Sequence, residues 1–220
     1  MSNVIPVYNF NEKTVSASSL DLGWDGSVLQ GIDVVDAISV YVRVIRNNMR
    51  MFSASTKTRG EVNFSTRKMW KQKGTGRARV GSAACPLWRK GGRIFGPRPG
   101  GRTLMINKES SKIAWQSLLD KKIRENSVVG LDLNLDSISK AKQAFNVLVE
   151  VCKNEQSACA KRFVFLVHQD ELGLLMPFCN LKQVVMETYE RADFLNLATA
   201  DYILFLKKDS ESFKNILHRN

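Results

Sequence analysis

The sequence contains little of what catalytic, metal-binding or exported proteins usually show. It has 2 histidines and 4 cysteines among 220 residues, and no two cysteines form a CxxC pair. We therefore expect free thiols in a reducing compartment, without a zinc site or a disulfide framework. Apolar runs stay well below the roughly 18 residues of a membrane-spanning helix, and the start lacks the pattern of a secretory signal. These absences predict a cytoplasmic protein with no metal, no cofactor and no membrane partner.

Acidic residues are almost missing from residues 57–102. This stretch holds 13 of the 33 lysines and arginines but only 1 of the 21 acids, so it carries the whole net charge of +12. It also holds 9 of the 14 glycines and 3 of the 5 prolines, with no helical or strand period of apolar residues. A basic segment that cannot bury a core of its own needs a large polyanion to order it, and a phosphate backbone is the best candidate.

The rest of the chain has the periodicities of an α/β domain. Val4–Phe10 and Thr14–Ala17 predict two short strands, and the apolar residues from Val34 to Met49 recur every three or four positions, as in a helix that begins at Asp33. Arg43, Arg46 and Arg50 then share one helix face, which either binds a partner or is simply solvated. A second helix is expected from Asn107, with Ala114, Leu118 and either Leu119 or Ile123 facing the core.

Strands and helices alternate after that second helix. Expected strands are 128–135, 163–168, 184–188 and 202–207, and expected helices are 138–152, 171–178, 193–200 and 210–217. Strands that are apolar at nearly every position, such as FVFLV, are typical of parallel sheets covered on both faces. We therefore predict a three-layer αβα fold with a mostly parallel sheet of about four strands. Residues 1–220 form one domain in this prediction, interrupted by an extended basic loop at 51–105.

Two motifs dominate the basic stretch: TRKMWKQKGTGRARVG at 66–81 and CPLWRKGGRIFGPRP at 85–99. Glycine lets a backbone approach phosphates, arginine can grip a phosphate with two hydrogen bonds, and aromatic rings can stack on bases. Phe64, Trp70, Trp88 and Phe95 are expected to find contacts on RNA or on a protein, unless they dock on the domain or cluster locally. The glycines at 74 and 76 lack the third glycine and the preceding strand of a dinucleotide-binding fingerprint.

Other functions have weaker support. An α/β enzyme that uses the basic loop as a clamp on nucleic acid would need converging acids at strand ends, where Asp132, Asp136 and Asp170 are candidates. Caps and turns explain these acids as well, and His168 and His218 lie near no nucleophile motif. A regulator that binds its own messenger RNA or a polymerase complex through the same surface stays open.

The segments WKQKGTGRARVGS from Trp70 and PLWRKGGRIFGPRP from Pro86 resemble the loop signature of a ribosomal protein family, the fourth protein of the bacterial large subunit. The order of the flanking elements agrees with that family over nearly the whole chain. Three departures are visible: Met69 where the family commonly has proline, Lys71 where it has arginine, and Gly100 to Arg102 in place of a more polar continuation.

The resemblance implies a structural constituent of the large ribosomal subunit, located in the ribosome and without enzymatic activity, that helps ribosomal RNA fold. It also implies that the loop penetrates ribosomal RNA and that its tip, Gln72 to Gly76, lines the tunnel through which nascent peptide leaves. Expected partners are ribosomal RNA, neighbouring large-subunit proteins and nascent peptide. The residues that we assign to RNA binding are Arg43, Arg46, Arg50, Lys57, Arg59, Arg67, Lys68, Trp70, Lys71, Gln72, Lys73, Gly74, Thr75, Gly76, Arg77, Arg79, Trp88, Arg89, Lys90, Arg93, Phe95, Arg98 and Arg102.

Overall fold

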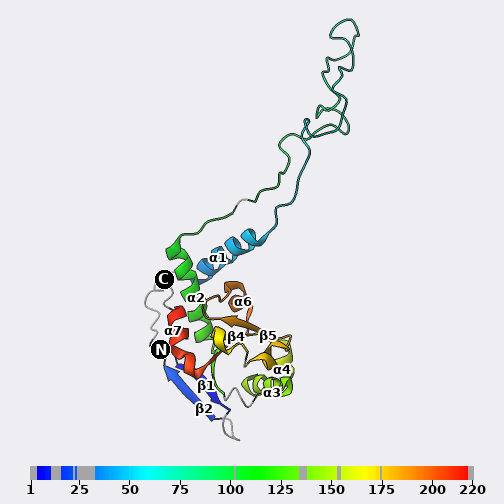
Figure 1. The fold of residues 1–220 in the computed structure, drawn as a ribbon. Coiled ribbons are helices and arrows are strands. Elements are labelled where there is room, and N and C mark those ends of the chain that lie inside the picture. The colour runs from blue at the N-terminus through cyan, green and yellow to red at the C-terminus, as the bar shows by residue number, and fades with distance from the viewer. Residues whose placement is uncertain are drawn as a thin grey trace. The chain divides into compact units, whose positions relative to one another are not determined.

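The computed structural model describes residues 4–10, 16–21, 23, 33–101, 103–133, 138–152, 155–173 and 175–217. The chain divides into two compact units (Figure 1). The first, here called the sheet unit, comprises Met1–Arg43 and Ile106–Asn220; the second, the basic unit, comprises Val44–Met105. Three residues that the sequence singled out, Arg102, Asp136 and His218, lie outside the described residues.

Within its described residues, the sheet unit is built on one mixed sheet of six strands, with the order β2-β1-β3-β6-β4-β5. The strands are β1 (Val4–Asn9), β2 (Ser16–Asp21), β3 (Val128–Asp132), β4 (Phe163–Val167), β5 (Val184–Thr188) and β6 (Tyr202–Leu206). Every neighbouring pair is parallel except β1 with β2, which form an antiparallel pair. The prediction of a mostly parallel sheet is confirmed. The predicted count of about four strands is too low, because the N-terminal pair joins the same sheet through β1 and β3.

The inner strands are buried on both faces, as their continuous apolar sequences predict. Successive side chains in a strand point to opposite faces. In β4, Phe163, Phe165 and Val167 pack in one core cluster with Leu148 of the helix α3 (Ala141–Cys152). In β6, Phe205 points to the other face, where its ring stacks on Phe213 of α7 (Ser210–Leu217) at 4.8 Å. Helices therefore cover both faces, which confirms the three-layer α/β architecture.

The remaining helices are α1 (Val34–Met49), α2 (Lys108–Arg124), α4 (Glu155–Ala160), α5 (Met176–Cys179) and α6 (Phe194–Thr199). Figure 1 shows α2 beside α7, and α3 beside α4. The core face predicted for α2 is confirmed, since Ala114, Leu118, Leu119 and Ile123 are all buried. None of the helices in the described ranges is long and apolar enough to cross a bilayer.

The first half of α1 is fixed to the sheet unit by three aromatic residues. The Phe194 ring lies edge-on to the ring of Tyr41 at 4.5 Å and to that of Trp115 at 5.2 Å. The Trp115 indole N–H also donates to the Tyr41 hydroxyl at 3.3 Å. At the start of the helix, Asp33 Oδ1 accepts from the amides of Val35 and Asp36, so Asp33 caps the helix where the sequence predicts that it begins.

The single helix predicted for residues 171–178 is wrong. The chain instead forms a 3-10 turn at Gln169–Glu171 and then the short helix α5. Pro177 lies in the first turn of α5, where its missing amide hydrogen is tolerated, whereas it would break a helix that began six residues earlier. Gly173 further weakens a continuous helix here.

The N-cap of α6 provides a test of the fold. Asp193 Oδ1 accepts from the Leu195 amide at 3.2 Å, while the Asp193 amide donates to Glu187 Oε2 at 2.7 Å. We expect Asp193→Ala to lower the free energy of unfolding by about 1 kcal/mol, because it removes the side-chain cap. Urea denaturation followed by circular dichroism measures this loss. Asp193→Asn keeps an acceptor and should stay within about 0.5 kcal/mol of the wild type; equal losses in both variants would contradict the role of the cap.

Candidate nucleic-acid interface

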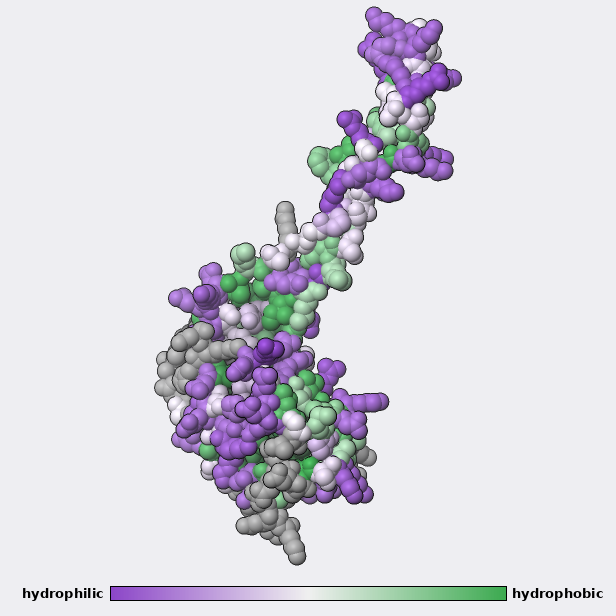
Figure 2. Space-filling view, viewed as in Figure 1, coloured by the Kyte–Doolittle hydropathy of each residue, from purple (hydrophilic) through white to green (hydrophobic). Residues whose placement is uncertain are grey.

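The basic unit presents its cations to solvent. All twelve of the predicted phosphate-binding lysines and arginines between Lys57 and Arg98 are exposed. Hydrophilic side chains cover much of this unit in Figure 2, with hydrophobic ones between them. The expectation that the stretch has no interior is wrong at one small place, where Ala84 and Gly92 are buried. Elsewhere the segment offers charge at its surface.

The predicted tip, Gln72 to Gly76, lies within a tight loop. The indole N–H of Trp70 donates to the carbonyl of Ala78 at 3.0 Å, which closes residues 70–78 into a turn. Gly74 and Gly76 have φ of +81° and +61°, in the left-handed region that glycine adopts most readily. Lys68 donates to the side chain of Gln72. The left-handed conformations of Gly74 and Gly76 thus bend the chain within this loop.

Two of the four aromatic residues cluster locally, which is the alternative that the sequence left open. The ring of Trp70 lies edge-on to that of Trp88 at 6.0 Å, and the Arg77 guanidinium lies 5.9 Å from the Trp70 centroid. Phe95 behaves differently, because it is fully exposed and has a φ of +53°. A bulky residue in this region is strained, and such strain is found mainly where surrounding structure or function requires it.

The three arginines of the predicted helix face are all exposed. Arg43 and Arg46 belong to α1, but Arg50 lies one residue beyond its end. The Arg50 guanidinium lies 5.6 Å from the ring centroid of Phe52. Only two of the three arginines therefore lie on the helix itself.

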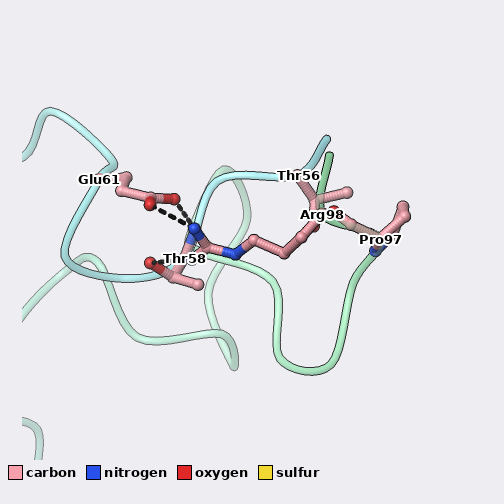
Figure 3. Close-up of polar contacts among 5 residues, drawn as sticks. All are labelled: Thr56, Thr58, Glu61, Pro97 and Arg98. Atoms are coloured by element: carbon pink, nitrogen blue, oxygen red, sulfur yellow. Dashed lines mark hydrogen bonds and ion pairs between the residues drawn. The ribbon is translucent and has the colours of Figure 1, made fainter. Parts of the chain in front are cut away.

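The sequence reasoning missed the contacts that hold the two ends of the basic unit side by side. Asn48 Nδ2 donates to the Leu104 carbonyl at 3.0 Å, and the Leu104 amide donates to Asn48 Oδ1 at 2.9 Å. Further along, the Thr56 amide donates to the Pro97 carbonyl at 3.0 Å, and Glu61 pairs with Arg98 (Figure 3). The one available signal was Glu61, the single acid among thirteen cations.

Two acids near the strand ends are paired with cations, and Asp170 is exposed in the 3-10 turn Gln169–Glu171. Asp132, at the end of β3, lies 3.0 Å from Lys207 Nζ, and Lys208 pairs with Glu171. His168 Nε2 lies 2.9 Å from the Ser212 hydroxyl and 3.9 Å from Asp209, whose pKa is raised above its ordinary value by burial. In the described part of the chain, no cluster of histidines, cysteines and acids is suited to hold a metal ion.

Comparison with known proteins adds independent information. The model of the Ribosomal protein L4/L1 family matches residues 33–216. The chain is 36% identical over 172 residues to the large ribosomal subunit protein uL4c of Trieres chinensis, covering 78% of each sequence. It is also 36% identical over 180 residues to the large ribosomal subunit protein uL4 of Finegoldia magna, covering 80% of this chain and 81% of the relative. The uL4 of Thermotoga maritima is 40% identical over 136 residues, 62% of this chain and 56% of the relative.

Proposed function

Because this chain belongs to the ribosomal protein L4/L1 family, we propose that it binds large-subunit ribosomal RNA through its basic unit. It is a structural protein of the ribosome rather than an enzyme, as the sequence predicts. The alternative of a nucleic-acid enzyme with a basic clamp is therefore wrong, and the family membership confirms the predicted location in the ribosome.

The observation that carries this proposal is the exposure of twelve cations in a segment with one acid. Held this close together, like charges repel one another, and condensation on phosphates relieves that repulsion. The domain organisation belongs to the proposal as well: one α/β domain over residues 1–220, interrupted by an RNA-binding loop at 51–105.

The finer part of the proposal concerns the tip. Residues Gln72 to Gly76 line the exit tunnel and contact nascent peptide, while neighbouring large-subunit proteins and ribosomal RNA surround the rest of the basic unit. Support comes from the resemblance of the segments that begin at Trp70 and Pro86 to the family's loop signature, and from the tight turn that the two glycines allow. Binding to its own messenger RNA through the same surface is compatible with this role, and gel-shift competition between ribosomal and messenger RNA separates the two.

The salt dependence of RNA binding tests the proposal. If about 8 of the cations neutralise phosphates, the plot of log K against log salt concentration should have a slope near roughly −6 to −7. The measurement is a titration of the whole chain against a large-subunit RNA fragment at several salt concentrations. A slope shallower than about −3 would count against phosphate binding by the basic unit.

A further inference from the structure

Two segments of the basic unit, distant in sequence, meet at a small set of polar contacts that we call the clasp: Thr56, Thr58, Glu61, Pro97 and Arg98 (Figure 3). Arg98 Nη1 lies 2.8 Å from Glu61 Oε1, and Arg98 Nη2 donates to the Thr58 hydroxyl at 3.4 Å. The Thr56 amide and hydroxyl both donate to the Pro97 carbonyl, at 3.0 and 3.4 Å. Arg98 is thus one of several groups that join the two segments.

Both oxygens of the Glu61 carboxylate have partners within the clasp. While Oε1 receives Arg98, Oε2 accepts from the Thr58 amide at 2.9 Å, and the Glu61 amide donates back to the Thr58 carbonyl at 3.0 Å. The Thr58 amide and, next, the Arg98 guanidinium hold the pKa of Glu61 below its ordinary value. At neutral pH the side chain is therefore a carboxylate, fixed by its own turn and facing Arg98.

The backbones of the two segments also come close together next to the clasp. A side chain at Gly92 would place its Cβ 2.2 Å from the Arg59 nitrogen, so only glycine fits there. Beside it, the Arg93 amide donates to the Lys57 carbonyl at 2.8 Å. The two segments therefore lie side by side through backbone contacts as well as through the ion pair.

A carboxylate in an RNA-binding segment weakens RNA binding, because it repels phosphates unless a cation neutralises it. From this geometry we propose that Arg98 neutralises Glu61 in the RNA complex and does not contact a phosphate, so that both are positioning residues that hold the two segments together. This proposal rests on RNA binding by the basic unit. It revises the sequence-based assignment of Arg98, which counts it among the residues that bind RNA.

A double-mutant cycle on the full chain tests the proposal with the same RNA fragment. Arg98→Gln should weaken binding about fivefold when Glu61 is present and less than about twofold in the Glu61→Gln background, because the harm comes from the unpaired acid. The matched control is Arg77→Gln, an exposed cation near the tip. It should weaken binding equally in both backgrounds and make the salt slope shallower by about 0.7 to 0.9.

Equal weakening by Arg98→Gln in both backgrounds, with the slope change seen for Arg77→Gln, would overturn the proposal in favour of a phosphate contact. No effect of Arg98→Gln in either background would also overturn it. A shallow slope in the wild type instead contradicts RNA binding itself, so the two failures are distinguishable.

A second measurement uses the free protein. Hydrogen exchange should show protection of the Thr56, Thr58 and Arg93 amides, a loss of that protection in Arg98→Gln, and no loss in Arg77→Gln. Unprotected amides in the wild type would refute the clasp in the free protein. Circular dichroism verifies that the sheet unit is folded in each variant.

Discussion

Replacing the six cations around the tip with glutamine should weaken binding to a large-subunit RNA fragment on the order of a thousandfold at about 0.15 M salt. The six are Arg67, Lys68, Lys71, Lys73, Arg77 and Arg79, all exposed. Each phosphate contact that is lost removes the release of condensed counterions, so the salt slope should also become shallower by about 4 to 5. The measurement is the same titration at several salt concentrations.

A charge-matched control separates a local site from net charge. Six exposed cations of the sheet unit can be replaced in the same way: Lys108, Lys140, Lys142, Arg162, Lys182 and Arg191. This variant has the same net charge as the tip variant, but its affinity should fall by less than about tenfold because long-range attraction is screened within about 8–10 Å. Equal loss in the two variants would show that total charge, rather than the basic unit, governs binding.

The largest effect on stability is expected at the centre of the sheet. Phe205 in β6 is completely buried, and its ring stacks on that of Phe213, also completely buried. The ring also lies close to Gly130 of β3, where an added Cβ would approach its Cζ atom to 3.3 Å. Phe205→Ala should lower the free energy of unfolding by about 3 to 5 kcal/mol, through lost burial and the cavity that remains.

Urea denaturation followed by circular dichroism measures this loss. Phe205→Leu keeps most of the buried volume and should cost about half as much or less. Under conditions where either variant is folded, the salt slope of RNA binding should equal that of the wild type, because the phosphate-binding cations are untouched. A loss below about 1 kcal/mol for Phe205→Ala would mean that the two stacked rings are not central to the core.

Much of the sheet unit could be predicted from its sequence because its elements have strong local patterns. The runs FVFLV and YILFL are apolar at every position, and both are buried parallel strands. The N-terminal strands were predicted as elements, yet their place beside β3 depends on contacts more than 100 residues apart, which leave no local pattern. The prediction of one helix over 171–178 was wrong because it relied on the apolar spacing and neglected Pro177, which is not tolerated inside a helix.

In the candidate nucleic-acid interface, too, some features could be predicted from the sequence and others could not. Charge composition located the cations, because it is a property of consecutive residues, whereas the tip at Gln72 to Gly76 came only from the resemblance to the family's loop signature. The pairing of Thr56 with Pro97, and of Glu61 with Arg98, joins residues about forty positions apart in an irregular segment. Without a repeating period, a sequence does not show which residues of such a segment pair with each other. The single acid, Glu61, was therefore the only sequence signal for the clasp.

The reciprocal hydrogen bonds between Asn48 and Leu104 have a consequence for how this part of the chain can evolve. Because Asn48, in the last turn of α1, and Leu104 are bonded to each other, they hold the two ends of the intervening chain together whatever its length. The chain between these residues can grow or shrink by several residues at little entropic cost, since closure entropy rises only with the logarithm of length. Relatives whose basic unit is longer or shorter should therefore conserve a bonded pair at these two positions, while the sheet stays unchanged.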